Sequence, residues 1–327
     1  MTLYLGIDIG GTKIAGGLVT DEGCVTLFDR RLTPLTGGAA ILEAVLALAR
    51  TLKTAAPEPI AAISIGTGGQ VNTERGVIAS ATGLLPGWAG TDVKAAFERA
   101  FGLPCFVDND VNALAAGEAR FGAGRGLATV LYLALGTGVG GALLLNGHVH
   151  HGATWTGGEF GHLLLTTDEA APRKTLEDWA SGPGLLQTYR EITGAGPEVT
   201  GEAVAAEAAS DPEGPAARAI ARTGECLGFG LASLANALDP DLIVIGGGLA
   251  ALGDALLDPA RHILRRYALP GPACCPVVPA ALGAEAAVIG AATLGMEPTP
   301  RQVATLPRLI GVKREGGREG SRGVASS

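Results

Sequence analysis

The chain contains 327 residues, 47% hydrophobic and 17% charged, so it can fill the cores of two ordinary domains and is not a disordered polymer. A formal net charge of −8 disfavours a general nucleic-acid binder, which would need a basic face. No apolar run reaches the roughly 18–20 residues of a membrane span, and no signal peptide is evident at the first residues. The five cysteines form no C-x-x-C pair, which predicts reduced thiols and a cytoplasmic location.

The first part of the chain predicts an antiparallel meander followed by alternating helices and strands. Strands are predicted at residues 3–9, 14–19, 24–28, 60–65 and 105–107, and helices at 38–53, 92–101 and from 108–110 to about 121. Residues 122–126, of sequence GAGRG, are the best candidate for a domain boundary.

The second part predicts strands at residues 128–135, 142–145 and 242–245, with helices at 182–193, 200–210, 225–238 and 284–294. Beyond residue 297 the chain turns polar, and residues 311–327 read as a disordered tail. One internal repeat stands out, because residues 131–141 echo residues 5–17 as strand, glycine-rich loop and strand. Two related lobes that face each other are the simplest arrangement.

The glycine-rich loops suit phosphate groups, because their N–H groups are unobstructed and Thr12 and Thr137 add hydroxyls. The alternative is a pair of hairpins that use glycine for turn geometry alone. Gly136, Gly138 and Gly141 match a dinucleotide fingerprint, but a strand follows them where that fingerprint needs a helix. Asp8 ends the first strand beside its loop, which implies Mg²⁺ held through water, unless Asp8 is simply a solvated strand end.

Taken together and in order, five short motifs resemble the ROK-family sugar kinases (repressor, open reading frame, kinase) over residues 3–295. The motifs are DIGGTK at 8–13, ND at 109–110, GTGVGG at 136–141, GEFGH at 158–162 and GGG at 246–248. The resemblance implies an α/β protein with the actin/hexokinase-type ATPase fold, in which two ribonuclease H-like lobes enclose a central cleft for ATP and sugar. It implies lobes at residues 1–121 and 122–283, with helix 284–295 completing the first lobe and a tail at 297–327.

By this resemblance Asp110 is the catalytic base. The local pattern agrees, since a carboxylate at a helix start is favoured in its ionised form and could accept a hydroxyl proton. The competing interpretation makes Asp108 or Asp110 a helix N-cap. The resemblance assigns sugar contacts to Asn109, Glu159, His162 and Glu177. It assigns ATP and its Mg²⁺ to Asp8, Gly10, Gly11, Thr12, Lys13, Gly136, Thr137, Gly138, Gly246, Gly247 and Gly248, with Asp8 holding the metal through water.

The chain departs from the family at its zinc element. Many members place three cysteines after the histidine that corresponds to His162, but residues 163–176 contain none, so a Cys₃His site cannot form and no zinc is predicted. His148, His150 and His151 resemble a metal tract, but they are expected on the exposed return of a hairpin, and the family does not use them. Gly68 and Gly83 replace residues common in the family and weaken any inference to glucose.

The predicted function is therefore Mg-ATP-dependent phosphorylation of a hexose or N-acetylhexosamine at the 6-hydroxyl, with glucose and N-acetylmannosamine as the leading substrates. The alternative is a non-catalytic sugar-binding protein or a sugar-responsive regulator, although family regulators carry a helix-turn-helix before the DIGG element and only seven residues precede Asp8 here. A homodimer is expected, without nucleic-acid or membrane partners. Polyphosphate remains an alternative phosphoryl donor.

Overall fold

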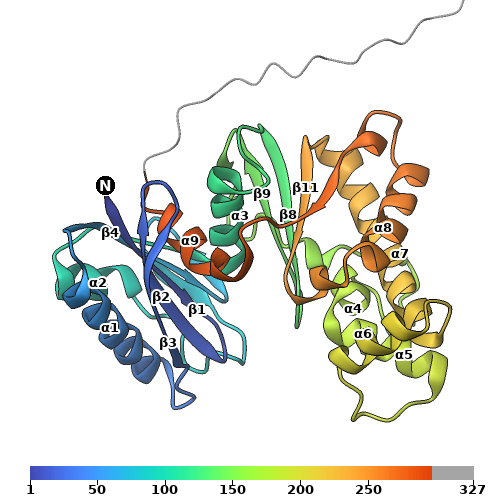
Figure 1. Ribbon diagram of the computed structural model, residues 1–327, viewed down its shortest axis with the longest axis horizontal. Helices are drawn as coiled ribbons and strands as arrows, with labels where there is room; N and C mark the ends of the chain where they lie inside the picture. Colours follow the sequence, from blue (N-terminus) through green and yellow to red (C-terminus); the bar gives the residue numbers. More distant parts are fainter. Residues whose placement is uncertain (297–327) are drawn as a thin grey trace, which may run out of the picture.

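The computed structural model describes residues 1–296 and divides them between two lobes, each built on one β-sheet (Figure 1). The sheet of the first lobe has the order β3-β2-β1-β4-β7, and that of the second has the order β10-β9-β8-β11-β12. A small ribbon of β5 (Gln70–Asn72) and β6 (Val77–Ser80) accompanies the first sheet. The predicted tail at 297–327 lies outside the described residues.

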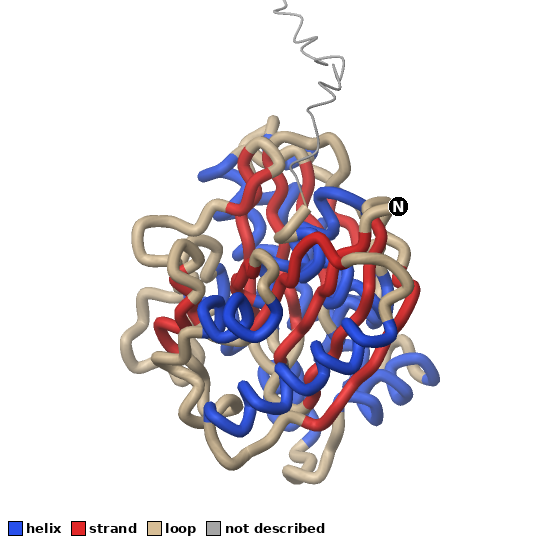
Figure 2. Tube along the Cα trace, turned by 90° about the vertical axis from the view of Figure 1, so that its left-hand side faces the viewer, coloured by secondary structure: helices blue, strands red, loops and turns tan. Residues whose placement is uncertain are grey.

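The first sheet is a meander extended by parallel strands. It consists of β1 (Leu3–Ile9), β2 (Lys13–Thr20), β3 (Val25–Leu32), β4 (Ile60–Thr67) and β7 (Cys105–Asn109). β1 pairs antiparallel with β2 and parallel with β4, and β4 pairs parallel with β7. Its central strands β1 and β4 are largely buried because helices cover both faces of the sheet, whereas β3 at the sheet edge is polar and partly exposed (Figure 2).

Helices α1 (Gly38–Ala55) and α2 (Val93–Phe101) lie on one side of the first sheet, and α9 (Ala286–Thr293) lies on the other (Figure 1). The sequence predicted α9 as a longer helix, but a 3₁₀ turn, Gly283–Glu285, precedes it. α9 packs directly on β1 because Gly6 has no side chain, and a Cβ there would collide with the carbonyl oxygen of Val288. The last described helix therefore packs on the sheet formed by the first residues of the chain.

The second sheet repeats the connectivity of the first. Its strands are β8 (Thr129–Leu135), β9 (Val139–Leu145), β10 (His148–Val149), β11 (Leu242–Gly246) and β12 (Val277–Pro279). Like β1, β8 pairs antiparallel with the next strand and parallel with a later one. The predicted repeat is therefore confirmed at the level of strand pairing. The first loop is one residue longer, since Ile9 pairs with Ile14 whereas Leu135 pairs with Val139.

Helix α3 (Asp110–Phe121) lies between the two sheets and packs against α9, β8 and β9 (Figure 1). The helices of the second lobe are α4 (Leu176–Ala180), α5 (Gly182–Thr193), α6 (Gly201–Ser210), α7 (Pro215–Leu238) and α8 (Asp254–Tyr267), with 3₁₀ turns at Phe160–His162, Gly248–Leu252 and Pro272–Cys274. Among the helices of residues 1–296, none combines the length and the hydrophobicity needed to cross a bilayer.

The helix pair α7 and α8 differs from the prediction. α7 begins at Pro215, ten residues before the predicted start, and α8 was not predicted. Glycines inside α7 lower its helix propensity, but tertiary packing requires them, because a Cβ at Gly224 would collide with the carbonyl oxygen of Leu256 in α8. α8 also carries Pro259 in its interior, a residue that normally argues against a helix.

Candidate active site

Two strands of the first sheet, β1 and β7, bring acidic residues to the same end of that sheet, on either side of β4. Asp8 of β1 pairs with Gly66 of β4, and Gly66 pairs with Asp108 of β7. β1, β4 and β7 run parallel, so these residues lie at the carboxyl ends of their strands. A Cβ on Gly66 would lie 3.5 Å from the Cα of Asp110 and 3.2 Å from the Cβ of Ala113. Glycine at this position therefore lets α3 start directly above β4, with Asp110 facing the end of β1.

Asp8 and Asp110 share an environment that disfavours ionisation of both. Burial, reinforced by the negative charge of Asp110, raises the pKa of Asp8 to about 7. Burial also raises the pKa of Asp110, opposed by hydrogen bonds that include one from the Val111 N–H to Oδ1 at 2.9 Å. A hard cation beside the two carboxylates would offset this cost. Mg²⁺ fits the donor set, because it keeps several waters and commonly uses one or two carboxylates together with phosphate oxygens.

The residue that caps α3 is neither Asp108 nor Asp110, the two candidates from the sequence. Asn109, not Asp108 or Asp110, caps α3, because its Oδ1 accepts hydrogen bonds from the N–H groups of Val111 and Asn112 at 2.8 and 3.3 Å. An asparagine side chain satisfies these N–H groups as well as a carboxylate would. The Nδ2 of Asn109 donates to the carbonyl of Gly69 at 3.0 Å. The capping hypothesis for Asp108 and Asp110 was therefore wrong.

The two glycine loops are tight turns, with Gly10 N–H donating to the carbonyl of Lys13 and Gly136 N–H donating to that of Gly138, each at 2.9 Å. Lys13 and Thr12 are exposed. Gly11 contacts Leu84, since a Cβ on Gly11 would lie 2.7 Å from that of Leu84. The segment around Leu84 therefore lies over the first loop.

The glycine motif at residues 246–248 contacts the start of the Gly136 loop. Gly247 has a φ of 82°, and a Cβ there would collide with the carbonyl oxygen of Leu135, at the point where β8 enters the Gly136 turn. Gly248 faces open space. The N–H of Gly182, at the start of α5, donates to the carbonyl of Gly136 at 2.8 Å. Gly136, Gly247 and the start of α5 therefore come together at one edge of the second sheet.

The predicted sugar contacts of the second lobe lie close to Asp110. Burial raises the pKa of Glu159; His162 opposes this, and the negative charges of Glu177 and Asp110 add to it. Because all three charges act on Glu159, the side chains of His162, Glu177 and Asp110 lie near it. Glu177 also accepts a hydrogen bond from the Val139 N–H at 2.8 Å, so it supports the end of the Gly136 loop, a role that the sequence did not indicate.

The histidine tract behaves differently from its prediction at one position. His148 and His150 are exposed, as expected, but His151 is half-buried and its Nε2 lies 2.7 Å from Oδ2 of Asp108. A contact across 43 residues leaves no local signal in the sequence. Within residues 1–296 no group of three or more His, Cys, Asp or Glu side chains is arranged for a metal ion. The predicted absence of zinc stays a prediction.

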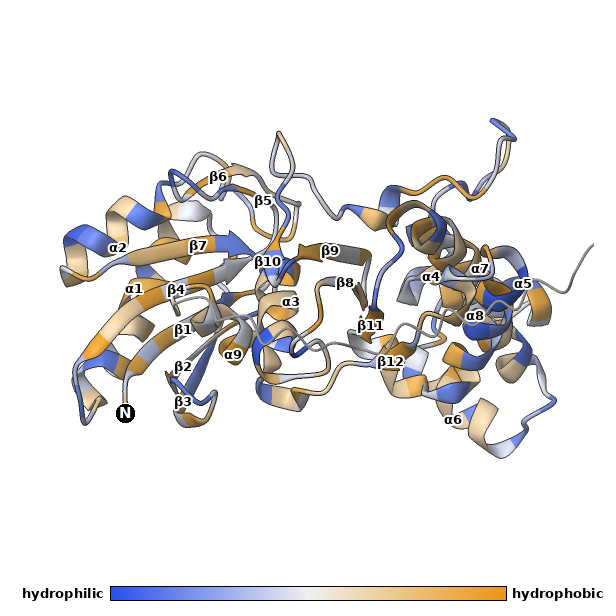
Figure 3. Ribbon diagram, turned by 90° about the horizontal axis from the view of Figure 1, so that it is seen from above, coloured by the Kyte–Doolittle hydropathy of each residue, from blue (hydrophilic) through white to orange (hydrophobic). Residues whose placement is uncertain are grey.

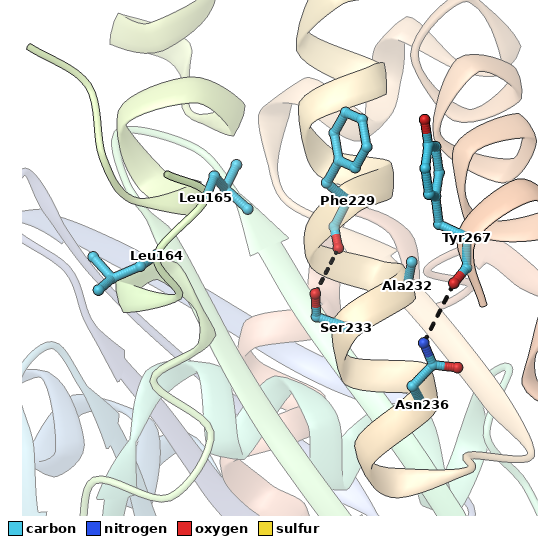
Figure 4. Close-up of a pocket in the computed structure, with 7 residues that line it drawn as sticks. All are labelled: Leu164, Leu165, Phe229, Ala232, Ser233, Asn236 and Tyr267. Carbon is cyan, nitrogen blue, oxygen red and sulfur yellow. Dashed lines mark hydrogen bonds between the residues drawn. The ribbon is translucent and has the colours of Figure 1, made fainter. Parts of the chain in front are cut away.

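A further pocket of about 290 Å³ lies on the second lobe (Figure 4). Its lining comes from the segment after the Phe160–His162 turn, from α7 and from the end of α8: Leu164, Leu165, Phe229, Ala232, Ser233, Asn236 and Tyr267. The rings of Phe229 and Tyr267 are 5.2 Å apart, and Asn236 accepts a hydrogen bond from Leu269 N–H at 2.7 Å. It contains none of the predicted site residues.

Two sheets of equal strand order, with carboxylates and glycine turns at facing edges, place the chain among the two-lobed phosphotransferases of the actin/hexokinase type. The ROK family model matches residues 4–297, and the chain belongs to the ROK family. It is a carbohydrate kinase with the fold of the ROK hexokinases, as the following relatives indicate.

The chain is 34% identical over 321 residues to a glucokinase of Streptomyces coelicolor, with 92% of this chain and 99% of that protein covered. It is 31% identical over 287 residues to an N-acetyl-D-glucosamine kinase of Yersinia pseudotuberculosis, covering 82% and 92% of the two chains. A crystal structure of a ROK glucokinase from Streptomyces griseus, in complex with glucose and AMPPNP, superposes with a TM-score of 0.75 at 32% identity, covering 89% and 98%.

Proposed function

We propose that the protein transfers the γ-phosphoryl group of Mg-ATP to the 6-hydroxyl of a hexose, with glucose as the first substrate to test. The proximity of Asp110 to Glu159, which also lies near Glu177, carries this proposal, because it would place a base on one lobe beside sugar ligands on the other. The glucose and AMPPNP held by the Streptomyces griseus relative support the same pair of ligands here. N-acetylmannosamine and N-acetylglucosamine are the alternative acceptors.

Asp110 accepts the proton of the attacking hydroxyl as the phosphoryl group arrives. A sugar hydroxyl is a weak nucleophile, and a base whose pKa lies above that of an ordinary carboxylate is better matched to this proton at neutral pH. Asn109, which caps α3, keeps the segment before Asp110 fixed. Glu159, His162 and Glu177 orient the sugar so that the hydroxyl faces Asp110, and this positioning supplies much of the rate enhancement.

The glycine loops hold the triphosphate. Backbone N–H groups of Gly10, Gly11 and Gly136–Gly138, with the hydroxyls of Thr12 and Thr137, bind phosphate oxygens, and Lys13 adds a positive charge. Gly246–Gly248 accommodates the adenosine end. Asp8 holds Mg²⁺ through water, and the ion, when bound, neutralises charge on the transferred phosphoryl group.

A coupled ADP-release assay tests the proposal with glucose, N-acetylmannosamine, N-acetylglucosamine and fructose, each with and without Mg²⁺. We expect Mg²⁺-dependent turnover with glucose, and regiochemistry at the 6-hydroxyl by NMR of the product. Parallel reactions with polyphosphate identify the donor. Sugar binding without turnover for every acceptor would favour the non-catalytic alternative, and a sequence-specific gel shift at moderate salt would favour the regulator.

The resemblance also leads us to propose a cytoplasmic homodimer. Light scattering would then give about twice the chain mass of 32.7 kDa. A mass equal to one chain over the working concentration range would contradict the dimer and leave the proposed reaction unaffected.

A further inference from the structure

His151 connects two segments that the proposed reaction uses separately. Its side chain contacts Asp108 at the hydrophilic end of β7, which points toward β10 in Figure 3. Its backbone carbonyl accepts a hydrogen bond from the Gly157 N–H at 2.9 Å, two residues before Glu159. One residue therefore contacts the first lobe through its side chain and holds the Glu159 loop of the second lobe through its backbone.

Asp108 is the first-lobe partner, and its surroundings make it sensitive to the loss of a donor. The residue is 5% exposed, and its Oδ1 accepts hydrogen bonds from the Asn109 N–H at 2.7 Å and the Asn112 Nδ2 at 2.9 Å. Its Oδ2 faces His151. A buried carboxylate oxygen that loses its donor must move or take in water. Because Asp108 directly precedes Asn109 and Asp110, any such movement reaches the base.

The hydrogen bond between His151 and Asp108 is compatible with either protonation state of the histidine. The hydrogen bond to Asp108 raises the pKa of His151, against the effect of partial burial. In either the neutral or the charged form, the ring can place a proton on Nε2 and donate it to Asp108.

We propose that His151 is a positioning residue, which donates a hydrogen bond to Asp108 and thereby sets the placement of Asp110 relative to Glu159. The inference rests on the proposed function, in which Asp110 and Glu159 act on the same sugar from different lobes. Neither the five motifs nor the family resemblance assigns His151 a role. A misplacement of about 1 Å between reacting groups lowers rates by about a hundredfold, so loss of this contact should appear in catalysis.

The experiment compares His151→Leu, His151→Gln and the control His148→Leu, which removes an exposed histidine three residues away. For His151→Leu we expect kcat/KM for the sugar to fall by about 10- to 100-fold, with a higher KM for the sugar and an unchanged KM for ATP. His151→Gln should recover most of the loss, because the glutamine amide can donate to Asp108 from a similar position. His148→Leu should match the wild type. If His151→Leu fails to fold, His151→Asn replaces it, since its shorter amide cannot reach Asp108.

A double-mutant cycle with Asp108→Asn tests whether His151 acts through Asp108. We expect the double variant with His151→Leu to be no worse than the poorer single variant, because both changes break one interaction. The inference is overturned if His151→Leu matches His148→Leu, if its KM for the sugar stays unchanged while only the folded fraction falls, or if the two losses multiply. A wild-type protein inactive on every sugar would instead overturn the proposed function and, with it, this inference.

Discussion

Among the single residues, Asp8 has a buried carboxylate whose ionisation lowers the stability of the fold but is required for its proposed role at Mg²⁺. Burial and Asp110 raise its pKa to about 7, so between about pH 4 and pH 7 the folded protein binds a proton that the unfolded chain releases. The contribution of this group to the free energy of unfolding is therefore full below the unfolded pKa and is lost as the pH rises through 7. The proposed Mg²⁺ ligand therefore destabilises the ligand-free protein at neutral pH relative to a neutral side chain.

Asp8→Asn should therefore stabilise the metal-free protein while it abolishes turnover. We expect a gain on the order of 2–4 kcal/mol at about pH 8, which shrinks toward about pH 4. Urea unfolding at several pH values, without Mg²⁺ or nucleotide, measures it. Asp21→Asn, at an exposed turn position, serves as the control. A constant difference across this range would contradict the raised pKa.

Asp110→Ala tests the base itself. Removal of a general base lowers rates by about 10²–10⁴, so kcat should fall by that factor. The sugar should still bind, because the proposed contacts to Glu159 and Glu177 are unchanged. Calorimetric titration with sugar reports binding, and a coupled assay reports turnover. Turnover close to that of the wild type would remove Asp110 from the catalytic role.

Which site residues a sequence can reveal depends on where their partners lie. Asp8, Asp110 and the glycine turns stand in short local motifs, and the resemblance of those motifs, in their order, to the ROK family nominated them. The contact of His151 with Asp108 and the support that Glu177 gives Val139 join segments far apart in the chain. Such pairs carry no local pattern. The first depends on how the two lobes meet and the second on packing inside the second lobe, and no short window of the sequence encodes either.

At the element scale, elements with local start and stop signals were the easiest to predict. α2 begins at the cap Asp92, whose Oδ1 accepts from the Ala95 N–H, and ends at Gly102 with a φ of 65°. α5 matched its predicted range, with Ser181 as its cap. α7 lies at the other extreme, because its glycines are chosen for contact with α8 rather than for helix propensity.

Helix α3 carries Glu118, whose carboxylate hydrogen-bonds to both chain segments that connect the two lobes. Glu118 is 1% exposed, and its Oε2 accepts from the Ala123 N–H at 2.8 Å, just after α3. Its Oε1 accepts from the N–H groups of Ala281 and Leu282 at 2.8 and 2.9 Å, just before α9. One buried carboxylate therefore connects the segment that leaves the first lobe after α3 with the segment that re-enters it before α9.

Glu118→Ala should be strongly destabilising, because it leaves three backbone N–H groups without this acceptor. We expect a loss of about 3–5 kcal/mol in the free energy of unfolding, measured by urea titration. Glu118→Gln should lose less, since its remaining carbonyl oxygen still accepts. Glu98→Ala, on the exposed side of α2, is the matched control and should change stability by less than about 0.5 kcal/mol. Equal stability of the two alanine variants would show that the Glu118 hydrogen bonds contribute little.

At the scale of the whole molecule, the repeat in the sequence anticipated two sheets of the same order. What it could not anticipate is a contact within the second lobe between the proposed sugar site and the proposed phosphate loop. Glu177 faces Glu159 at the sugar end and accepts a hydrogen bond from Val139, beside the Gly136 loop. A Cβ on Gly138 would lie 2.5 Å from the Glu177 carboxylate. The proposed sugar ligand and the proposed phosphate loop are therefore in direct contact.

This contact predicts that sugar and nucleotide bind with positive coupling. A nucleotide that orders the Gly136 loop should also fix Glu177 for the sugar. The second ligand then binds with a smaller loss of conformational entropy than it would alone. We expect AMPPNP to lower the Kd for glucose about 5- to 150-fold, and glucose to lower the Kd for AMPPNP by the same factor, because equilibrium coupling is reciprocal.

Isothermal titration of each ligand, with and without a saturating amount of the other, measures both factors. Glu177→Ala should reduce the coupling toward unity while AMPPNP alone still binds, since the glycine turns and Lys13 remain. The Glu98→Ala variant should keep the wild-type coupling. A glucose affinity that is the same with and without AMPPNP in the wild type would show that the two ligands do not communicate through Glu177.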